Sequence, residues 1–129
     1  MRILALVLVL GATPIFAQEV DCSTAENQQD MNACAEAEWQ KADVFLNETY
    51  GNAMAVMKEY DVGLPDEEQG AAKQMRAAQR AWITYRDATC AAEGFAMHGG
   101  SAEPLLVYGC LARVTAERAD DLKQIATNN

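Results

Sequence analysis

Apolar residues recur every three or four positions along most of this chain, which is the pattern of amphipathic helices. The first apolar stripe starts after Asn27, a residue type that suits a helix N-cap, and runs to the Gly and Pro of residues 61–65. At 1.5 Å per residue, this helix would be about 50 Å long. Its apolar face is Met31, Ala35, Trp39, Ala42, Leu46, Tyr50, Ala53, Met57 and Tyr60.

Two further helices follow. Residues 65–68 (PDEE) predict the start of the second, since acidic side chains favour a helix N-terminus. Residues 94–104 hold three glycines and a proline and predict a loop, after which Pro104 begins the third helix. With no alternating β-branched run, the fold class is all-α, an elongated antiparallel three-helix bundle. The stripes are Ala71, Met75, Ala78, Trp82, Tyr85 and Thr89, and then Val107, Leu111, Val114, Arg118, Leu122 and Ile125.

The N-terminus has a different pattern. Arg2 precedes an unbroken apolar run over residues 3–10, and a small residue, Ala17, follows shortly after. This is the layout of a secretory signal peptide, and the run is too short to span a bilayer of about 30 Å. We therefore predict a signal peptide over residues 1–17 and a single helical domain over residues 18–129, periplasmic or secreted and without a membrane anchor. The alternative is a buried N-terminal helix.

Export determines how the four cysteines are interpreted. In an oxidising compartment an even number of cysteines indicates disulfides, and no pair has the C-x-x-C spacing of zinc or oxidoreductase sites. Four cysteines allow three pairings. If the second and third predicted helices form an antiparallel hairpin, Cys90 and Cys110 come together across the predicted loop. If the segment before the first helix (the lead-in segment) folds back over that helix, Cys22 comes close to Cys34. These disulfides would stabilise a bundle whose hydrophobic core is thin.

Composition excludes several classes of function. Of 129 residues, 19 are acidic and 10 basic, and the net charge of -9 argues against a nucleic-acid partner. The single histidine excludes a multi-His metal site. The two serines, Ser23 and Ser101, lack the context of a catalytic triad, and no phosphate-binding glycine loop is present. We expect neither enzymatic activity nor a cofactor.

Polar residues interrupt the helix-facing stripes. Because Arg is rarely buried without a partner, we interpret them as an inter-helix network, for example Asp43 with Arg86, rather than as a binding site. Together with aromatic neighbours, the set is Asp43, Asn47, Tyr50, Gln79, Trp82, Tyr85, Arg86, Thr115 and Arg118.

Several of these residues lie in segments that resemble a known family. The segments are MNACAEAEWQKADVFLNETY (31–50), AQRAWITYRDATC (78–90), HGGS (98–101) and CLARVTAERADDL (110–122). They resemble the lysozyme-inhibitor LprI-like domain, and residues 79–90 are the most specific part. The resemblance implies a small exported helical protein with paired cysteines, and inhibition of lysozyme. The namesake's lipid-attachment cysteine has no counterpart here.

The resemblance leads to two function hypotheses. In the first, the protein inhibits a lysozyme-type cell-wall hydrolase by occluding its cleft, and the acidic charge steers it to a basic lysozyme. The inhibitory segment would be Phe95, Met97, His98, Gly99, Gly100 and Ser101, with His98 or Ser101 bonding the catalytic carboxylates; alternatively, the glycines simply form a turn. In the second, it is a non-catalytic envelope interaction module or an immunity-type protein with another protein partner. The oligomeric state stays open.

Overall fold

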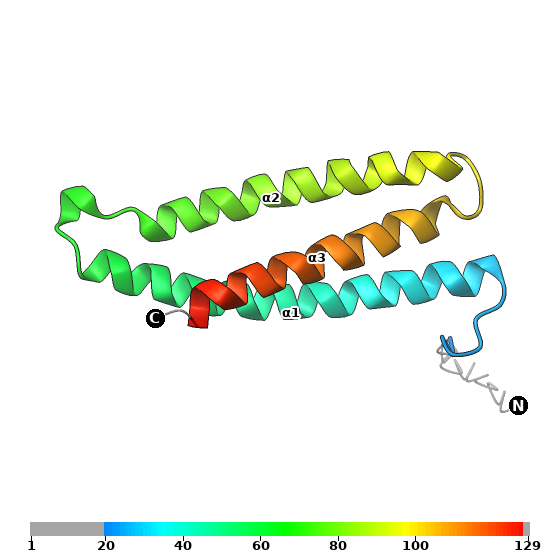
Figure 1. The fold of residues 1–129 in the computed structure, drawn as a ribbon, viewed down its shortest axis with the longest axis horizontal. Coiled ribbons are helices and arrows are strands. Elements are labelled where there is room, and N and C mark those ends of the chain that lie inside the picture. Colours follow the sequence, from blue (N-terminus) through cyan, green and yellow to red (C-terminus); the bar gives the residue numbers. More distant parts are fainter. Residues whose placement is uncertain (1–19, 128–129) are drawn as a thin grey trace, which may run out of the picture.

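The computed structural model describes residues 20–127, which form a bundle of three long helices (Figure 1). The helices are α1 (Gln28–Val62), α2 (Ala71–Gly94) and α3 (Glu103–Thr127). α3 packs along α1 and also contacts α2, whereas α1 and α2 contact each other less. The predicted all-α, elongated three-helix bundle is confirmed, and the described residues contain no strand. The predicted signal peptide lies outside the described residues.

α1 begins as its sequence predicts. The side chain of Asn27 accepts a hydrogen bond from the backbone N–H of Asp30 at 2.9 Å. Its amide nitrogen also donates to the Asp30 carboxylate at 2.6 Å. The cap satisfies a backbone donor that the helix leaves without a partner, so the start of the 35-residue helix is fixed locally.

The start of α2 differs from the prediction. Residues 66–68 form a separate single turn of 3-10 helix, η1 (Asp66–Glu68), and α2 begins only at Ala71. The Asp61 carboxylate, at the end of α1, accepts hydrogen bonds from the N–H groups of Gly70, Ala71 and Ala72 at 2.7, 2.7 and 3.0 Å. A side chain from the preceding helix therefore caps α2.

These bonds make Asp61 sensitive to pH. The N–H groups of Gly70, then of Ala72 and Ala71, together with the charge of Arg76, hold the pKa of Asp61 below its ordinary value of 3.8. Because the folded-state pKa is the lower one, the carboxylate stabilises the fold above pH 3.8 and stops doing so as pH falls through the folded-state pKa.

We therefore expect Asp61→Asn to lower the free energy of unfolding at neutral pH, since the amide lacks the charge that these N–H groups favour. Urea unfolding of both proteins between neutral pH and about pH 2 measures the effect. The difference between them should shrink only in acid. A difference that stays constant across this range would contradict the proposed role of Asp61.

The core consists of two clusters along the bundle. One lies toward the α1–α2 connection and the other toward the α2–α3 connection, and Trp82 packs against both. The first cluster is Leu46, Ala53, Met54, Ala72, Met75, Ala119 and Leu122, and the second is Cys90, Cys110, Leu111 and Val114.

The inward face of α2 includes Met75 and Trp82 of the predicted apolar stripe but differs from that stripe at other positions. Gln79 and Arg86 are buried, whereas Tyr85 is 61% exposed and Ala78 is exposed. Tyr85 precedes Arg86 by one residue, which places it about 100° around the helix. The prediction of Tyr85 as part of the inter-helix network is therefore wrong. Polar residues occupy the inward face because partners on the other helices satisfy them.

Both local disulfides are present. Cys22 and Cys34 are joined with their Cα atoms 5.6 Å apart, and Cys90 and Cys110 with theirs 5.4 Å apart. The first bridge attaches the lead-in segment to α1, and the second joins the end of α2 to the start of α3. The described residues contain no free cysteine, so the other two pairings are excluded.

Candidate functional site

The connection between α2 and α3 forms one end of the bundle (Figure 1). The Cys90–Cys110 bridge closes its base, and both cysteines are buried, at 0% and 3% exposure. Gly94, at the end of α2, allows a close approach, because a Cβ there would lie 2.5 Å from a methyl carbon of Val107. The base of the loop is therefore rigidly joined to both helices.

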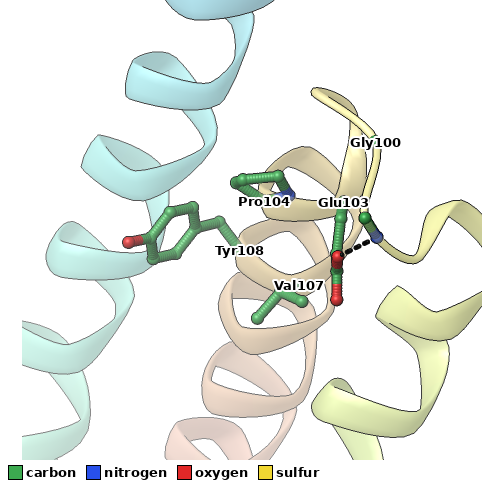
Figure 2. A pocket seen from close by; sticks show the side chains of 6 residues that line it. Gly100, Glu103, Pro104, Val107 and Tyr108 are labelled. Carbon is green, nitrogen blue, oxygen red and sulfur yellow. Dashed lines mark hydrogen bonds between the residues drawn. The ribbon is translucent and has the colours of Figure 1, made fainter.

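The loop is also ordered by its own hydrogen bonds. It starts with a 3-10 turn, η2 (Phe95–Met97), and Gly99 then takes φ +74°, a backbone region that favours glycine. The Glu103 carboxylate accepts a hydrogen bond from the Gly99 N–H at 2.7 Å, drawn as the dashed line in Figure 2. It also lies 3.2 Å from Nδ1 of His98. Glu103 of α3 thus fixes the turn.

Glu103 also orients the His98 ring. The Gly99 N–H, and after it the His98 side chain, lower the pKa of Glu103, so this carboxylate is ionised at neutral pH. An ionised carboxylate can only accept hydrogen bonds, so Nδ1 of His98 carries the proton. Nε2, on the other side of the ring, is then an acceptor when the ring is neutral.

The tip presents apolar surface beside this ring. The rings of Phe95 and His98 stack with centroids 4.4 Å apart and planes 6° apart. Phe95 is 65% exposed and Met97 51% exposed. The exposed Ser101 joins the loop to α1, because its backbone carbonyl accepts a hydrogen bond from the side chain of Asn32 at 2.9 Å. The structure therefore brings Phe95, His98 and Met97 together at the tip, while Ser101 lies at its attachment to α1.

A shallow pocket of about 480 Å³ lies beside the turn (Figure 2). Gly99, Gly100 and Glu103 line it on one side, and Pro104, Val107 and Tyr108 add an apolar wall. The side chain of Tyr108 points toward α1, where its ring stacks on Trp39 with centroids 5.8 Å apart. This stacking packs the start of α3, which follows the loop directly, against α1.

The predicted inter-helix network is present in part. The Asp43 carboxylate lies 3.5 Å from the guanidinium of Arg86 and accepts a hydrogen bond from Asn47 at 3.2 Å. Arg118 of α3 donates to Gln79 of α2 at 3.1 Å. Tyr50 and Trp82 pack against the core, and the Arg86 guanidinium lies 5.1 Å from the centre of the Trp82 ring.

Thr115 does not join this network. It is fully buried, and among the described residues its hydroxyl has no hydrogen-bond partner. An unpaired buried hydroxyl costs free energy, so we expect Thr115→Val to raise the free energy of unfolding by about 1 kcal/mol. Thr49 is the matched control, because its buried hydroxyl donates to the carbonyls of Phe45 and Leu46. Denaturant unfolding should show no gain for Thr49→Val, and an equal gain for both would contradict this account.

The half of the bundle that carries the loop has acidic side chains but no Lys or Arg. Residues 20–40 and 88–112 contain no Lys or Arg. Arg113, which follows directly, donates to Glu93 at 2.7 Å and so is already paired. A positively charged partner would be attracted to this end. The carboxylates here belong to Asp21, Glu26, Asp30, Glu36, Glu38, Glu93 and Glu103.

Sequence reasoning missed the two side chains that hold the loop. Glu103 lies in the first turn of α3, directly before Pro104, where an acidic residue can accept bonds from preceding N–H groups. That position was a usable signal. Asn32 gave none, because its partner Ser101 is 69 residues away in sequence. Among residues 20–127, no group of three or more His, Cys, Asp or Glu side chains is placed to hold a metal ion.

Comparison with known proteins agrees with this fold. The family model described as "Lysozyme inhibitor LprI" matches residues 20–122. The chain belongs to the LprI family. The description of the family is that of an inhibitor of lysozyme. Within the described part of this LprI-family chain, no helix has the length and hydropathy needed to cross a membrane.

Two relatives show how far the similarity extends. An uncharacterized protein of Rhizobium meliloti (strain 1021) is 45% identical over 127 residues, covering 94% of this chain and 91% of the relative. The crystal structure of a DUF1311 family protein from Pseudomonas putida KT2440 is 28% identical, with a TM-score of 0.67. That match covers 81% of this LprI-family chain and 97% of the other. The helical bundle is thus shared with this DUF1311 family protein.

Proposed function

We propose that this LprI-family protein is a periplasmic inhibitor of a lysozyme-type cell-wall hydrolase and that the α2–α3 loop enters the cleft of the target. The observation that carries the proposal is the exposed Phe95–His98 stack at the tip of a loop closed by a buried disulfide. A preorganised loop loses little conformational entropy on binding, so more of its contact energy becomes affinity.

The chemistry of the tip matches the cleft of such an enzyme. Glycosidases of this kind use one protonated carboxylic acid and one ionised carboxylate. When its ring is neutral and Nδ1–H faces Glu103, His98 offers Nε2 as an acceptor to the protonated acid. Phe95 adds a flat apolar surface beside it. The acidic half of the bundle would speed association with a basic lysozyme, and this attraction would weaken with salt.

The experiment is a cell-wall turbidity assay with purified lysozymes of several classes. We expect inhibition of at least one class by the mature chain. The Phe95→Ser/His98→Ala variant should inhibit about tenfold less strongly, since truncating central contact residues typically costs more than about 1 kcal/mol. Val62→Ser is the control, because Val62 is 84% exposed at the far end of α1 and should not matter.

The possible failures separate two claims. No inhibition of any class at micromolar protein would reject the proposed function and favour an envelope interaction module. Full inhibition by Phe95→Ser/His98→Ala, with wild-type stability, would reject the loop as the inhibitory segment and leave lysozyme inhibition standing.

A further inference from the structure

A groove with a volume of about 430 Å³ is lined by side chains of α1 and α2. It exists because the contact between α1 and α2 is less extensive than the contact between α1 and α3. Asn47 and Tyr50 line it from α1, and Arg76, Arg80, Ile83 and Arg86 line it from α2. The volume lies within the range of small-molecule sites.

The groove gathers positive charge in an acidic protein. Three of the ten basic residues of the chain line it, against one lining carboxylate, that of Asp43. Asp43 already faces Arg86 at 3.5 Å and accepts a hydrogen bond from Asn47. The groove therefore holds an excess of positive charge that its own walls do not neutralise.

Arg76 and Arg80 carry this excess. They lie one helical turn apart, so their side chains project from the same face of α2. Within the part of the chain that the structure describes, neither has a carboxylate within 4.0 Å, although the charge of Arg76 acts on Asp61. Arg86 is different, because Asp87 accepts from its Nε at 2.9 Å and two indole rings cover it. Arg86 forms the fixed floor of the groove, while Arg76 and Arg80 are available to a ligand.

We propose that this groove binds a small organic anion, whose carboxylate or phosphate group is held between Arg76 and Arg80. Guanidinium groups match the planar oxygen pairs of carboxylates and phosphates with two parallel hydrogen bonds. The body of the ligand lies against Ile83, which is 40% exposed, and the hydroxyl of Tyr50 and amide of Asn47 supply further polar contacts. This site is separate from the loop, and the proposal does not depend on lysozyme inhibition.

Backbone amide NMR titrations of the mature chain test the proposal with three probes. N-acetylmuramic acid presents a carboxylate, a sugar phosphate presents a phosphate, and N-acetylglucosamine is uncharged. At least one anionic probe should shift the signals of residues 43–50 and 76–86 saturably, and the uncharged sugar should not. The anion that binds more tightly identifies the charged group for which the groove is built.

The Arg76→Gln/Arg80→Gln variant should bind the anionic probe roughly tenfold or more weakly, because hydrogen bonds to charged groups each contribute about 1.5–3 kcal/mol. Lys58→Gln/Lys123→Gln removes the same charge from exposed positions outside the groove and should bind as wild type does. The proposal is overturned if neither anion binds, if the uncharged sugar binds equally well, or if both double variants weaken binding equally. Arg76→Gln/Arg80→Gln should still inhibit lysozyme, so this proposal and the loop model can fail independently.

Discussion

Replacing Cys90 and Cys110 together with alanine should lower the free energy of unfolding by about 3 kcal/mol, since this bridge closes a loop of some twenty residues. The separation of the two cysteines is 20 residues, and both are buried in the second core cluster. The effect is large for this fold because α2 makes limited contact with α1. The position of α2 therefore depends strongly on α3 and on this bridge. Denaturant unfolding followed by circular dichroism measures the loss.

The same variant should also weaken lysozyme inhibition, because the loop would lose its closed base and bind at a higher entropic cost. Cys22→Ala/Cys34→Ala is the matched control. It opens a bridge with a separation of 12 residues at the same end of the bundle, but between the segment before α1 and α1 itself, where Cys22 is exposed. That control should lose stability and keep inhibition. If Cys90→Ala/Cys110→Ala inhibits as well as wild type while still folded, the bridge is not what makes the loop effective.

Arg86→Ala should lower the free energy of unfolding by about 2–3 kcal/mol, because it removes a buried cation from two aromatic faces together with its packing. The Arg86 guanidinium lies 5.8 Å from the centre of the Trp39 ring and 5.1 Å from that of Trp82. Its side chain is only 10% exposed. The partner carboxylates of Asp43 and Asp87 are 42% and 58% exposed, so water can replace the lost contacts there. Most of the loss should therefore come from the aromatic contacts.

Two further variants test this division. Arg86→Lys keeps the charge and loses the planar group that stacks on indole, so it should recover only part of the stability. Arg80→Ala, at an exposed position one and a half turns away, should change stability by no more than about 0.5 kcal/mol. Chemical denaturation of all three variants at two salt concentrations distinguishes the contribution of the aromatic contacts from that of the charge. Full recovery by lysine would show that charge rather than stacking holds Arg86 in place.

Much of the fold could be predicted from local sequence. The Asn27 cap, the breakers after α1 and the glycine-rich segment after α2 each act through neighbouring residues, and each has the predicted position. The predicted start of α2 was wrong because the side chain that caps this helix is Asp61, which lies at the end of the preceding helix. The acidic residues 66–68 could not reveal this, because which side chain caps α2 depends on how α1 and α2 are placed relative to each other.

The candidate site was likewise predicted only where its features depend on local sequence. The loop and its exposed residues were predicted, because glycine and proline specify a turn without reference to the rest of the chain. The stack of Phe95 on His98 and the bond from Asn32 to Ser101 were not. The inward face of α2 was predicted only in part: Gln79 and Arg86 are buried as expected of the inter-helix network, but Tyr85 is exposed. Apolar periodicity ranks tyrosine above arginine for burial, and only the partners contributed by other helices reverse that order.

The sequence by itself determined an all-α chain of three helices, its glycine-rich loop and its acidic excess, and it favoured the local pairing of the cysteines without excluding the other two. These follow from backbone propensity, capping and spacing, which act over a few residues. The tertiary structure alone decided that Tyr85 is exposed beside the buried Arg86, that Asn32 holds the loop at Ser101, and that Arg76 and Arg80 face an open groove. Each of these depends on how three helices are rotated about their axes. That rotation is a balance among contacts between residues far apart in the chain.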